Sequence, residues 1–359
     1  MLIGSFSVDW FYNQDAGVAS MGACCYHRIV MPLRELRKHG YETVLGLMFR
    51  QHPDGHIQVA EGDGVWVDPD IVIFQRWMGR EGPDLVRRAR ACGQIVINEI
   101  DDDFWSLPKG HPAVAITDPV AHPDHNREHY RAMIAASDGI IASTRPLADV
   151  MGELGPPVFL CRNAVDLENW PLLEPSGGLR VGWVGAAKWR ANDLAGLVGV
   201  LGPFLKREGG EFVHVGHLDN VRPVWEQLQI PRGVKVTAIS LTPIWDYPKA
   251  WADLSLVVVP LEDIPFNHSK SWLRGLEASA CGFPFIAQDV PEYRELGAGR
   301  LARQGHEWRH HLRVLLDPDV RRAEGLANRA RAEELSIDKH WQDWAGVLAE
   351  FGCEIPVAA

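Results

Sequence analysis

Residues 260–287 read PLEDIPFNHSKSWLRGLEASACGFPFIA, and this stretch predicts a strand, a loop, a helix and a second strand. An apolar run over residues 256–261 leads into a polar loop, and helical spacing begins near Ser269. Gly282, a residue type that commonly ends helices, precedes a second short apolar run. A chain that repeats this order builds a parallel sheet covered by helices on both faces, so the predicted fold class is α/β.

The start of the predicted helix has the features of a phosphate site. Ser269, Lys270 and Ser271 would lie where unpaired backbone N–H groups and the positive end of the helix dipole favour an anion. Glu277 would lie two turns further along the same helix. The same residues also fit an ordinary capped helix with a solvated lysine, because serine is a common cap. The sequence leaves both interpretations open.

The composition predicts a globular protein of two domains. A chain of 359 residues exceeds the size of one ordinary core, and 46% hydrophobic with 23% charged residues is typical of globular proteins. Lys and Arg number 36 against 47 Asp and Glu, which gives a net charge of −11. This charge disfavours a broad polyanion-binding surface, although it is compatible with a local basic cleft.

The termini and the cysteines predict a cytoplasmic protein. The chain starts without a basic segment followed by a long apolar region, and no apolar run reaches membrane-spanning length. The six cysteines form no C-x-x-C pair and have no regular spacing. We therefore expect free thiols in a reducing compartment.

A proline- and glycine-rich stretch over residues 170–178 separates two series of alternating strands and helices. Such a composition is typical of a linker between domains. The first domain would span residues 1–170 and the second residues 171–337. Each series would build its own doubly wound parallel sheet.

Three further helices are predicted from apolar spacing. A helix over residues 23–39 contains Pro32, which predicts a kink or a restart near Met31. A helix over residues 191–207 contains several glycines that weaken its far half. The third helix is predicted over residues 248–254.

Three consecutive aspartates, Asp101, Asp102 and Asp103, directly follow a predicted strand. The carboxyl ends of strands are where doubly wound sheets bind ligands, so these carboxylates are candidates for function. They could hold a divalent metal, or one of them could act as a general base. They could also cap the next helix and hold the loop.

Four histidines lie among prolines and acids between residues 109 and 129. The spacing of three of them could place imidazoles on one helix face, as in a metal site. No cysteine pattern or H-E-x-x-H accompanies them, which disfavours a metal. We therefore expect an active-site loop that leads into a helix over residues 126–136. The histidines are His111, His122, His125 and His129.

The second domain opens with residues 181–190, VGWVGAAKWR, in which a strand runs into a glycine turn. Lys188 and Arg190 follow the turn, so backbone donors and two cations could together cradle a diphosphate. The spacing is neither that of a Walker loop nor G-x-G-x-x-G. A solvated basic entry to a helix fits the stretch equally well.

Three motifs in this order resemble the GT-B glycosyltransferases, in particular the large, mostly retaining family that uses nucleotide sugars. Residues 163–166, NAVD, are similar to the N-G-[IV]-D that closes the family's first domain. Residues 181–190 are similar to its G-x-x-G phosphate loop, and residues 269–284 to its E-x7-E-A-x-A-x-G-x-P signature, the most specific match. The resemblance implies two Rossmann-like, doubly wound domains facing each other across a cleft. It also implies that a C-terminal helix over about residues 338–359 packs back on the first domain.

The resemblance gives the matching donor-side residues their roles. Glu277 would hold the ribose hydroxyls, while Lys188 and Arg190 would neutralise the diphosphate. The amides of residues 269–271 would bind phosphate, and the loop after residue 239 would meet the nucleobase. The implied donor-binding residues are Gly185, Ala186, Lys188, Arg190, Ser240, Leu241, Asn267, Ser269, Lys270, Ser271 and Glu277.

The first domain would supply the acceptor side. Gly22 and the helix with Arg28 stand where the family has its glycine-rich first loop, and Asn163 would belong to the same side. In an inverting reaction a carboxylate or imidazole of this domain would take the acceptor proton, whereas in a retaining reaction the leaving phosphate could take it. The catalytic candidates are Asp101, Asp102, Asp103, His27 and Lys188.

One departure from the family concerns Ser269, which stands where the first glutamate of E-x7-E would fall. In the family that carboxylate contacts the sugar near the reacting carbon, so the sugar and the stereochemical outcome stay open. Lys270, beside it, could contact phosphate or a sugar hydroxyl. No cofactor is required by this scheme, because cations and a helix dipole would stabilise the leaving nucleoside diphosphate.

Several alternatives stay open. A sugar-nucleotide epimerase or phosphorylase can share the two-domain architecture, and a GT-A-like transferase would use the three aspartates to bind a divalent metal. A non-catalytic sugar- or nucleotide-binding module is the third alternative. The acceptor could be a glycan, a lipid, a protein, a small molecule or a hydroxymethylated DNA base, the last being disfavoured by the net charge of −11.

Overall fold

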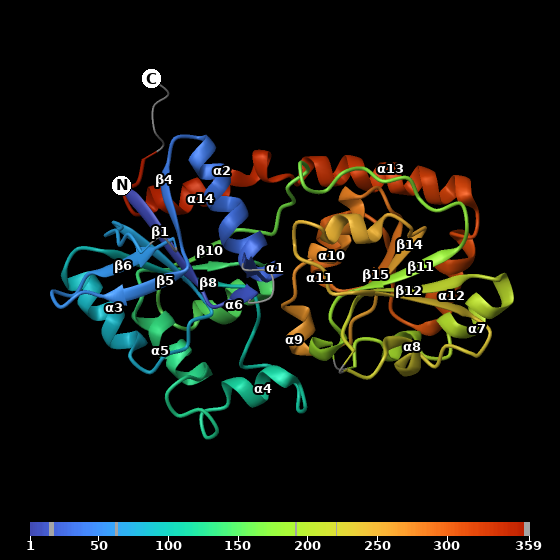
Figure 1. The fold of residues 1–359 in the computed structure, drawn as a ribbon, viewed down its shortest axis with the longest axis horizontal. Coiled ribbons are helices and arrows are strands. Elements are labelled where there is room, and N and C mark those ends of the chain that lie inside the picture. The colour runs from blue at the N-terminus through green and yellow to red at the C-terminus, as the bar shows by residue number, and fades with distance from the viewer. Residues whose placement is uncertain (14–17, 62–63, 191, 220, 355–359) are drawn as a thin grey trace.

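Two six-stranded parallel sheets lie side by side in the computed structural model (Figure 1), which describes residues 1–13, 18–61, 64–190, 192–219 and 221–354. The first sheet has the order β10-β9-β8-β7-β1-β4, and the second has the order β13-β12-β11-β14-β15-β16. In both sheets the strand order reverses beside the first strand, which is the mark of doubly wound folds. The predicted α/β class and the pair of Rossmann-like domains are confirmed.

The inner strands of both sheets are short apolar runs that are buried on both faces, as expected for parallel sheets covered by helices, whereas the edge strands are partly exposed. The first sheet consists of β1 (Leu2–Ser7), β4 (Glu42–Gly46), β7 (Ile71–Gln75), β8 (Ile95–Ile100), β9 (Gly139–Ala142) and β10 (Val158–Leu160). The second consists of β11 (Arg180–Val184), β12 (Glu211–His217), β13 (Lys235–Ser240), β14 (Leu256–Val259), β15 (Phe285–Gln288) and β16 (Arg300–Ala302). Two antiparallel pairs flank the first sheet, β2 (Trp10–Asn13) with β3 (Val18–Met21) and β5 (Met48–Gln51) with β6 (Ile57–Ala60).

Helices connect the strands of each domain. Those of the first are α1 (Ala23–Cys25), a π-helical turn η1 (Tyr26–Val30), α2 (Met31–Lys38), α3 (Gly82–Ala91), α4 (Pro112–Thr117), α5 (Arg127–Ala136) and α6 (Arg145–Gly152). Those of the second are η2 (Ala187–Trp189), η3 (Ala195–Leu197), α7 (Leu201–Glu208), α8 (Val224–Gln227), η4 (Tyr247–Trp251), α9 (Pro265–His268), α10 (Leu273–Ala280), α11 (Pro291–Leu296), α12 (Gly305–Val314) and α13 (Pro318–Glu334).

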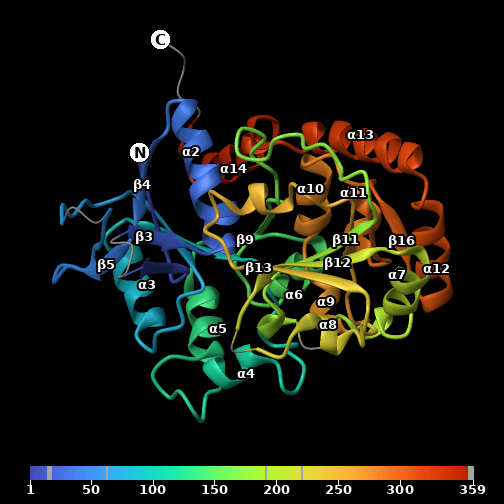
Figure 2. The same ribbon diagram turned by 45° about the vertical axis from the view of Figure 1, so that its right-hand side comes forward.

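The last helix, α14 (Ile337–Glu350), returns to the first domain. It packs along α2, and the two helices lie side by side in both views (Figures 1 and 2). Trp344 and Leu348 of α14 belong to the same buried cluster as Ile29 and Leu33. The chain therefore passes between the domains twice, near residue 165 and near residue 336. The two connections are hydrogen-bonded to each other, and the Val165 amide donates to Leu335 O (3.2 Å). The Ile337 amide donates back to Val165 O (2.9 Å).

Three local predictions need correction or refinement. Residue 191 lies outside the described residues, and over residues 192–200 the helix predicted for 191–207 is wrong, because Gly199 takes a φ of +69°. The far half, which the glycines were expected to weaken, forms the regular helix α7. The helix predicted over residues 248–254 is the 3-10 turn η4. The restart predicted near Met31 is confirmed, and the π-helical turn η1 precedes it, since Pro32 has no N–H to continue the ladder.

Candidate functional site

The carboxyl ends of the two sheets meet at an interdomain site joined by direct contacts. The Lys270 ammonium donates to Asp102 Oδ1 (3.0 Å), and the Thr144 hydroxyl donates to Ser269 O (2.9 Å). Behind them, the Asn163 side-chain amide donates to the Ser271 hydroxyl (2.7 Å). The residues after β8 and β9 thus touch the segment that precedes α10, which places the two candidate halves of the site against each other.

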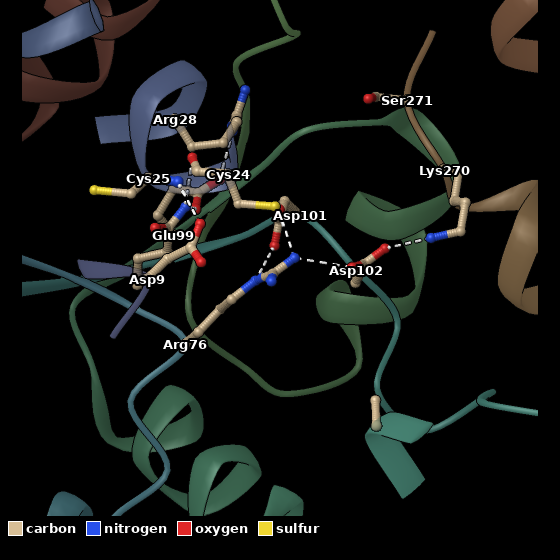
Figure 3. A network of polar contacts seen from close by, with 12 residues as sticks. Asp9, Cys24, Cys25, Arg28, Arg76, Glu99, Asp101, Asp102, Lys270 and Ser271 are labelled. Carbon is tan, nitrogen blue, oxygen red and sulfur yellow. Dashed lines mark hydrogen bonds and ion pairs between the residues drawn. The ribbon is translucent and has the colours of Figure 1, made fainter. Parts of the chain in front are cut away.

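Arg76 neutralises two of the three consecutive aspartates. Its guanidinium donates to both carboxylate oxygens of Asp101 (2.7 Å each) and to Asp102 Oδ2 (2.8 Å), as Figure 3 shows. Arg76 has a φ of +58°, an uncommon conformation for a residue other than glycine, directly after β7. The resulting chain Asp101, Arg76, Asp102, Lys270 runs from one domain to the other.

The two partners of the interdomain ion pair respond differently to burial. For Asp102, burial opposes ionisation, but Lys270 and then Arg76 outweigh it and lower the pKa of the carboxyl to about 2. For Lys270, burial prevails over the attraction of Asp102 and lowers the pKa of the ammonium, with Arg190 acting in the same direction. The difference arises because three cations, Lys270, Arg76 and Arg190, favour the charged form of Asp102. For Lys270, burial and the like charge of Arg190 together outweigh the attraction of the carboxylates of Asp102 and Asp193.

Asp103 and the nearby histidines hold the backbone of the loop. Asp103 Oδ1 accepts from the amides of Trp105 (3.1 Å) and Ser106 (3.3 Å), which is the structural interpretation left open above. His111 caps α4, and His122 and His129 contact the separate carbonyls of Ala115 and Pro123. Among the described residues, no three His, Cys, Asp or Glu side chains are grouped to hold a metal.

Arg28 and Asn163, both expected on the acceptor side, serve the interior and the domain junction in this structure. Arg28 is buried, and its guanidinium donates hydrogen bonds to Glu99 Oε1 (2.6 Å), Cys161 O (2.7 Å) and Asn163 Oδ1 (3.2 Å). The carbonyl of Asn163 accepts from the Trp272 indole (2.9 Å). Both residues therefore fix the position of the segment before α10.

The Asp9 carboxylate at the start of α1 leaves no room for a side chain at Gly22. Its amide donates to Asp9 O (2.8 Å), and a Cβ at this position would lie 2.1 Å from Asp9 Oδ2. The same carboxylate oxygen accepts from the Cys25 amide (3.1 Å), so it occupies the N-terminus of α1. Burial raises the pKa of Asp9, and Arg76 opposes this shift.

Hydrogen bonds to both its amide and its carbonyl fix Gly185, the glycine turn of the second domain. Gly185 has a φ of +130°; its amide donates to Val215 O (2.8 Å), and its carbonyl lies 3.0 Å from His214 Nε2. Burial lowers the pKa of His214 to about 4, so near pH 7 this neutral ring must donate to the carbonyl. Because the peptide is trans, the Ala186 N–H points away from His214.

The two cations after the turn are placed differently. Lys188 is exposed in η2, while Arg190 is partly buried and its guanidinium lies 3.7 Å from Asp193. Asn267 is buried and donates to Asp193 (2.7 Å) and to the carbonyl of Glu262 (3.0 Å). Asn267 therefore supports the carboxylate that faces Arg190.

The predicted phosphate-binding helix start is wrong in detail. Pro265 opens the separate single turn α9, so α10 begins at Leu273 rather than near Ser269. The amides of Ser269 and Lys270 donate to Asn267 O, which leaves them engaged within the chain. These residues form the connection between the two helices and touch the first domain there.

Glu277 lies on α10 and faces His27 of the first domain. His27 Nε2 is 3.2 Å from Glu277 Oε1, and both side chains are almost fully buried. The angles at this contact do not fit a hydrogen bond, so neither ring nitrogen of His27 has a hydrogen-bond partner among the described residues. The structure thus brings the predicted ribose-binding residue and a catalytic candidate together.

Ser240 ends β13 and Leu241 follows it, and both residues are exposed, as a site for a nucleobase requires. The loop that follows reaches the first domain, where the Trp245 ring lies 5.3 Å from the ring of Tyr26. The guanidinium of Arg34 also lies 5.0 Å from the Trp245 ring centre. This loop is therefore anchored on the helix that carries His27.

Three residues of the site had no role in the sequence interpretation: Arg76, His214 and Arg274. Arg274 lies three residues before Glu277, a helical spacing that placed it on the same face, and this was the available signal. Arg76 directly follows β7, and a basic residue at the carboxyl end of a strand could have been matched with the aspartates after β8. For His214, within β12, the sequence offers no such signal.

Comparison with solved structures identifies the fold. Sucrose-phosphate synthase from Thermosynechococcus elongatus matches with a TM-score of 0.69 and 14% identity, over 98% of this chain and 99% of that chain. HepE from Anabaena, in complex with UDP and glucose, matches with a TM-score of 0.59 and 14% identity, over 98% of this chain and 100% of that chain. The chain therefore has the GT-B fold, and the GT-A-like alternative is wrong.

No family model matches the sequence, and no curated protein matches it. Among the described residues, no helix combines the length and apolar character needed to cross a membrane.

Proposed function

We propose that this protein is a glycosyltransferase that moves a sugar from a nucleoside-diphosphate sugar to an acceptor hydroxyl. The observation that carries the proposal is the glycine turn at Gly185, followed by Lys188 and Arg190, at the interdomain edge of a GT-B fold. HepE, which shares the fold, has been solved with UDP-glucose. A nucleotide sugar is accordingly the proposed donor.

The charge that develops on the leaving diphosphate determines what the donor site must do. Lys188, Arg190 and Lys270 would stabilise this charge, and the arrangement requires no metal. Lys270 reaches phosphate only by exchanging its contact with Asp102, so donor binding would loosen one interdomain ion pair. Glu277 would likewise exchange His27 for the ribose hydroxyls.

On the acceptor side, His27 is the best candidate for a proton acceptor. Asp101 and Asp102 are held by Arg76, and Asp103 holds backbone amides, whereas the ring nitrogens of His27 have no hydrogen-bond partner among the described residues. An inverting reaction would pass the acceptor proton to His27, and a retaining reaction would pass it to the leaving phosphate. The closed domains would exclude water that hydrolyses the donor.

The six cysteines are free thiols, which supports the cytoplasm as the proposed compartment. For the acceptor, we propose only its reacting group, a hydroxyl.

The test is a thermal-shift screen of nucleoside diphosphates and their sugars, followed by product analysis. A ligand that binds the native state raises the apparent melting temperature, and we expect this for one nucleotide series. With its sugar donor, the enzyme should release the nucleoside diphosphate and should remain active in EDTA. A rearranged sugar nucleotide formed without acceptor would instead identify an epimerase. A lack of both binding and turnover across the panel would refute the proposal.

A further inference from the structure

The guanidinium of Arg274 lies directly against the glycine turn of the second domain. A Cβ built on Gly185 would lie 2.0 Å from Nη2, 2.7 Å from Cζ and 3.1 Å from Nη1 of Arg274. Any side chain at position 185 would therefore displace this guanidinium. Arg274 comes from the first turn of α10, so it brings a cation from the helix to a turn that already carries Lys188 and Arg190.

Arg274 is positioned by packing and has no ion-pair partner of opposite charge in the part of the chain that the structure describes. Its Cζ lies 5.6 Å from the centre of the Trp183 ring, which holds the side chain in place. Among the described residues, its guanidinium has no hydrogen bond and no ion pair within 4.0 Å, and the side chain is nevertheless partly buried. Buried guanidinium groups are normally paired, as Arg28 is with Glu99, because desolvation of an isolated charge is costly.

Like charges gather around the turn. Burial first, and then Arg190, lower the pKa of Arg274 to about 10, so that the group stays charged near pH 7. Arg190 also lowers the pKa of Lys270, whose own largest influence is burial. Repulsion among these cations is relieved when an anion binds between them. A planar guanidinium can donate two parallel hydrogen bonds to a phosphate, which suits this position.

We infer that Arg274 binds the diphosphate of the donor at the Gly185 turn and stabilises it as the leaving group. This inference rests on the proposed function and adds a residue for which the resemblance gives no role. The glycine at position 185 is then required by the arginine that covers it as well as by its own backbone conformation.

The test compares Arg274→Met with wild type in nucleotide affinity and in ligand-free melting temperature. The variant should bind the nucleotide more weakly without being less stable. Calorimetric titration with UDP, GDP, ADP and dTDP should show a Kd about 10- to 100-fold higher in the variant for the diphosphate that wild type prefers. Methionine keeps the packing on Trp183 and removes an unpaired charge, so the ligand-free melting temperature should stay equal or rise. Arg274→Lys should recover part of the affinity.

Arg207→Met is the matched control. Arg207 also lies over an aromatic ring, with Cζ 5.9 Å from the centre of Phe204. It belongs to the last turn of α7, which leads to the start of β12 at the opposite edge of the sheet. It should bind the nucleotide as wild type does. Arg274→Gln provides a second neutral variant should the methionine variant fail to fold.

The outcomes separate this inference from the proposed function. Equal diphosphate affinity in wild type and either neutral variant overturns the role of Arg274 and leaves the transferase intact. Inorganic pyrophosphate that stabilises wild type but not Arg274→Met, with no response to any nucleotide, supports Arg274 and refutes the nucleotide donor. A wild-type protein that responds to neither nucleotides nor pyrophosphate overturns both.

Discussion

The two sides of the interdomain site treat buried charge in opposite ways. In the first domain, the Arg28 guanidinium forms an ion pair with Glu99. The Arg76 guanidinium forms ion pairs with Asp101 and Asp102. On the second, Arg274 has no partner of opposite charge among the described residues. The contrast teaches that charge neutralised within the chain builds the scaffold, whereas charge left uncompensated is available for a ligand.

The largest expected effect tests the scaffold side. Arg76→Met leaves the Asp101 carboxylate without its ion-pair partner and Asp102 with Lys270 alone, and we expect the free energy of unfolding to fall by about 3–5 kcal/mol. Urea unfolding followed by tryptophan fluorescence measures this change. The triple variant Arg76→Met, Asp101→Asn, Asp102→Asn should regain most of the loss. A loss below about 1 kcal/mol, the value of a surface pair, would contradict the contrast.

His214 and Asp102 should lose their contributions to the free energy of unfolding in different pH ranges. The pKa of His214 is lowered to about 4 in the folded protein, below its ordinary value, so the stability from the neutral ring is present above pH 6.5. It is lost progressively as the pH falls from about 6.5 to about 4, by about 3 kcal/mol in total. Asp102, with a pKa lowered to about 2, loses its contribution only below its ordinary pKa, from about pH 4 downward.

His214→Gln is the control for this pH profile. The glutamine amide can still donate to the Gly185 carbonyl and does not titrate, so its stability should change less between pH 7 and pH 5 than that of wild type. Parallel profiles of the two proteins, measured by urea unfolding at each pH, would show that His214 does not carry the dependence.

Kinetics should separate two donor-side residues. Lys188→Ala should lower kcat by about 10- to 100-fold, because the charge on the leaving group is greatest in the transition state. Glu277→Ala should mainly weaken donor binding, by about 10-fold, because it removes an acceptor for the ribose hydroxyls. Titration with the preferred nucleoside diphosphate and steady-state assays measure both. Unchanged kinetics in both variants would refute this assignment of the donor site.

The smallest expected effect lies at the ion pair that joins the two sides. Asp102→Asn releases Lys270 while Asp101 still holds Arg76, so Lys270 becomes available for phosphate. We expect a roughly 2- to 5-fold lower Kd for the nucleoside diphosphate, within the ~1 kcal/mol typical of such pairs. Lys270→Met should raise the Kd instead. A Kd that is the same in all three proteins would show that Lys270 does not meet phosphate.

Much of the fold could be predicted because its signals are local. Apolar runs of strand length recur between helices, and a parallel sheet requires that order, so β8 followed by Asp101 and β11 followed by Gly185 could be placed from sequence. The helix predicted over residues 191–207 failed in its first half, where Gly199 takes a positive φ. Its far half, which the glycines were expected to weaken, is the regular helix α7.

The partners of the charged residues could not be predicted in this way. Lys270 meets Asp102 across 168 positions of sequence, and the tertiary arrangement decides that contact. The helix start predicted near Ser269 was wrong for a local reason that was visible in the sequence, since Pro265 opens a separate helical turn before it. Whether a guanidinium is neutralised, as for Arg76, or left unpaired, as for Arg274, depends on distant segments.

The chain passes between the domains at Val165 and again at residues 335–337, and the two connections lie side by side. This arrangement matters for protein engineering and for how such proteins evolve. Because α14 packs beside α2, both ends of the described chain belong to the first domain, and the second domain is an insert whose entry and exit meet at one place. Such an insert can be exchanged as a cassette between two neighbouring splice points if Ile244 and Tyr247, which pack against the core of the first domain, are retained. Donor preference and acceptor preference could then be recombined by swapping a single continuous segment.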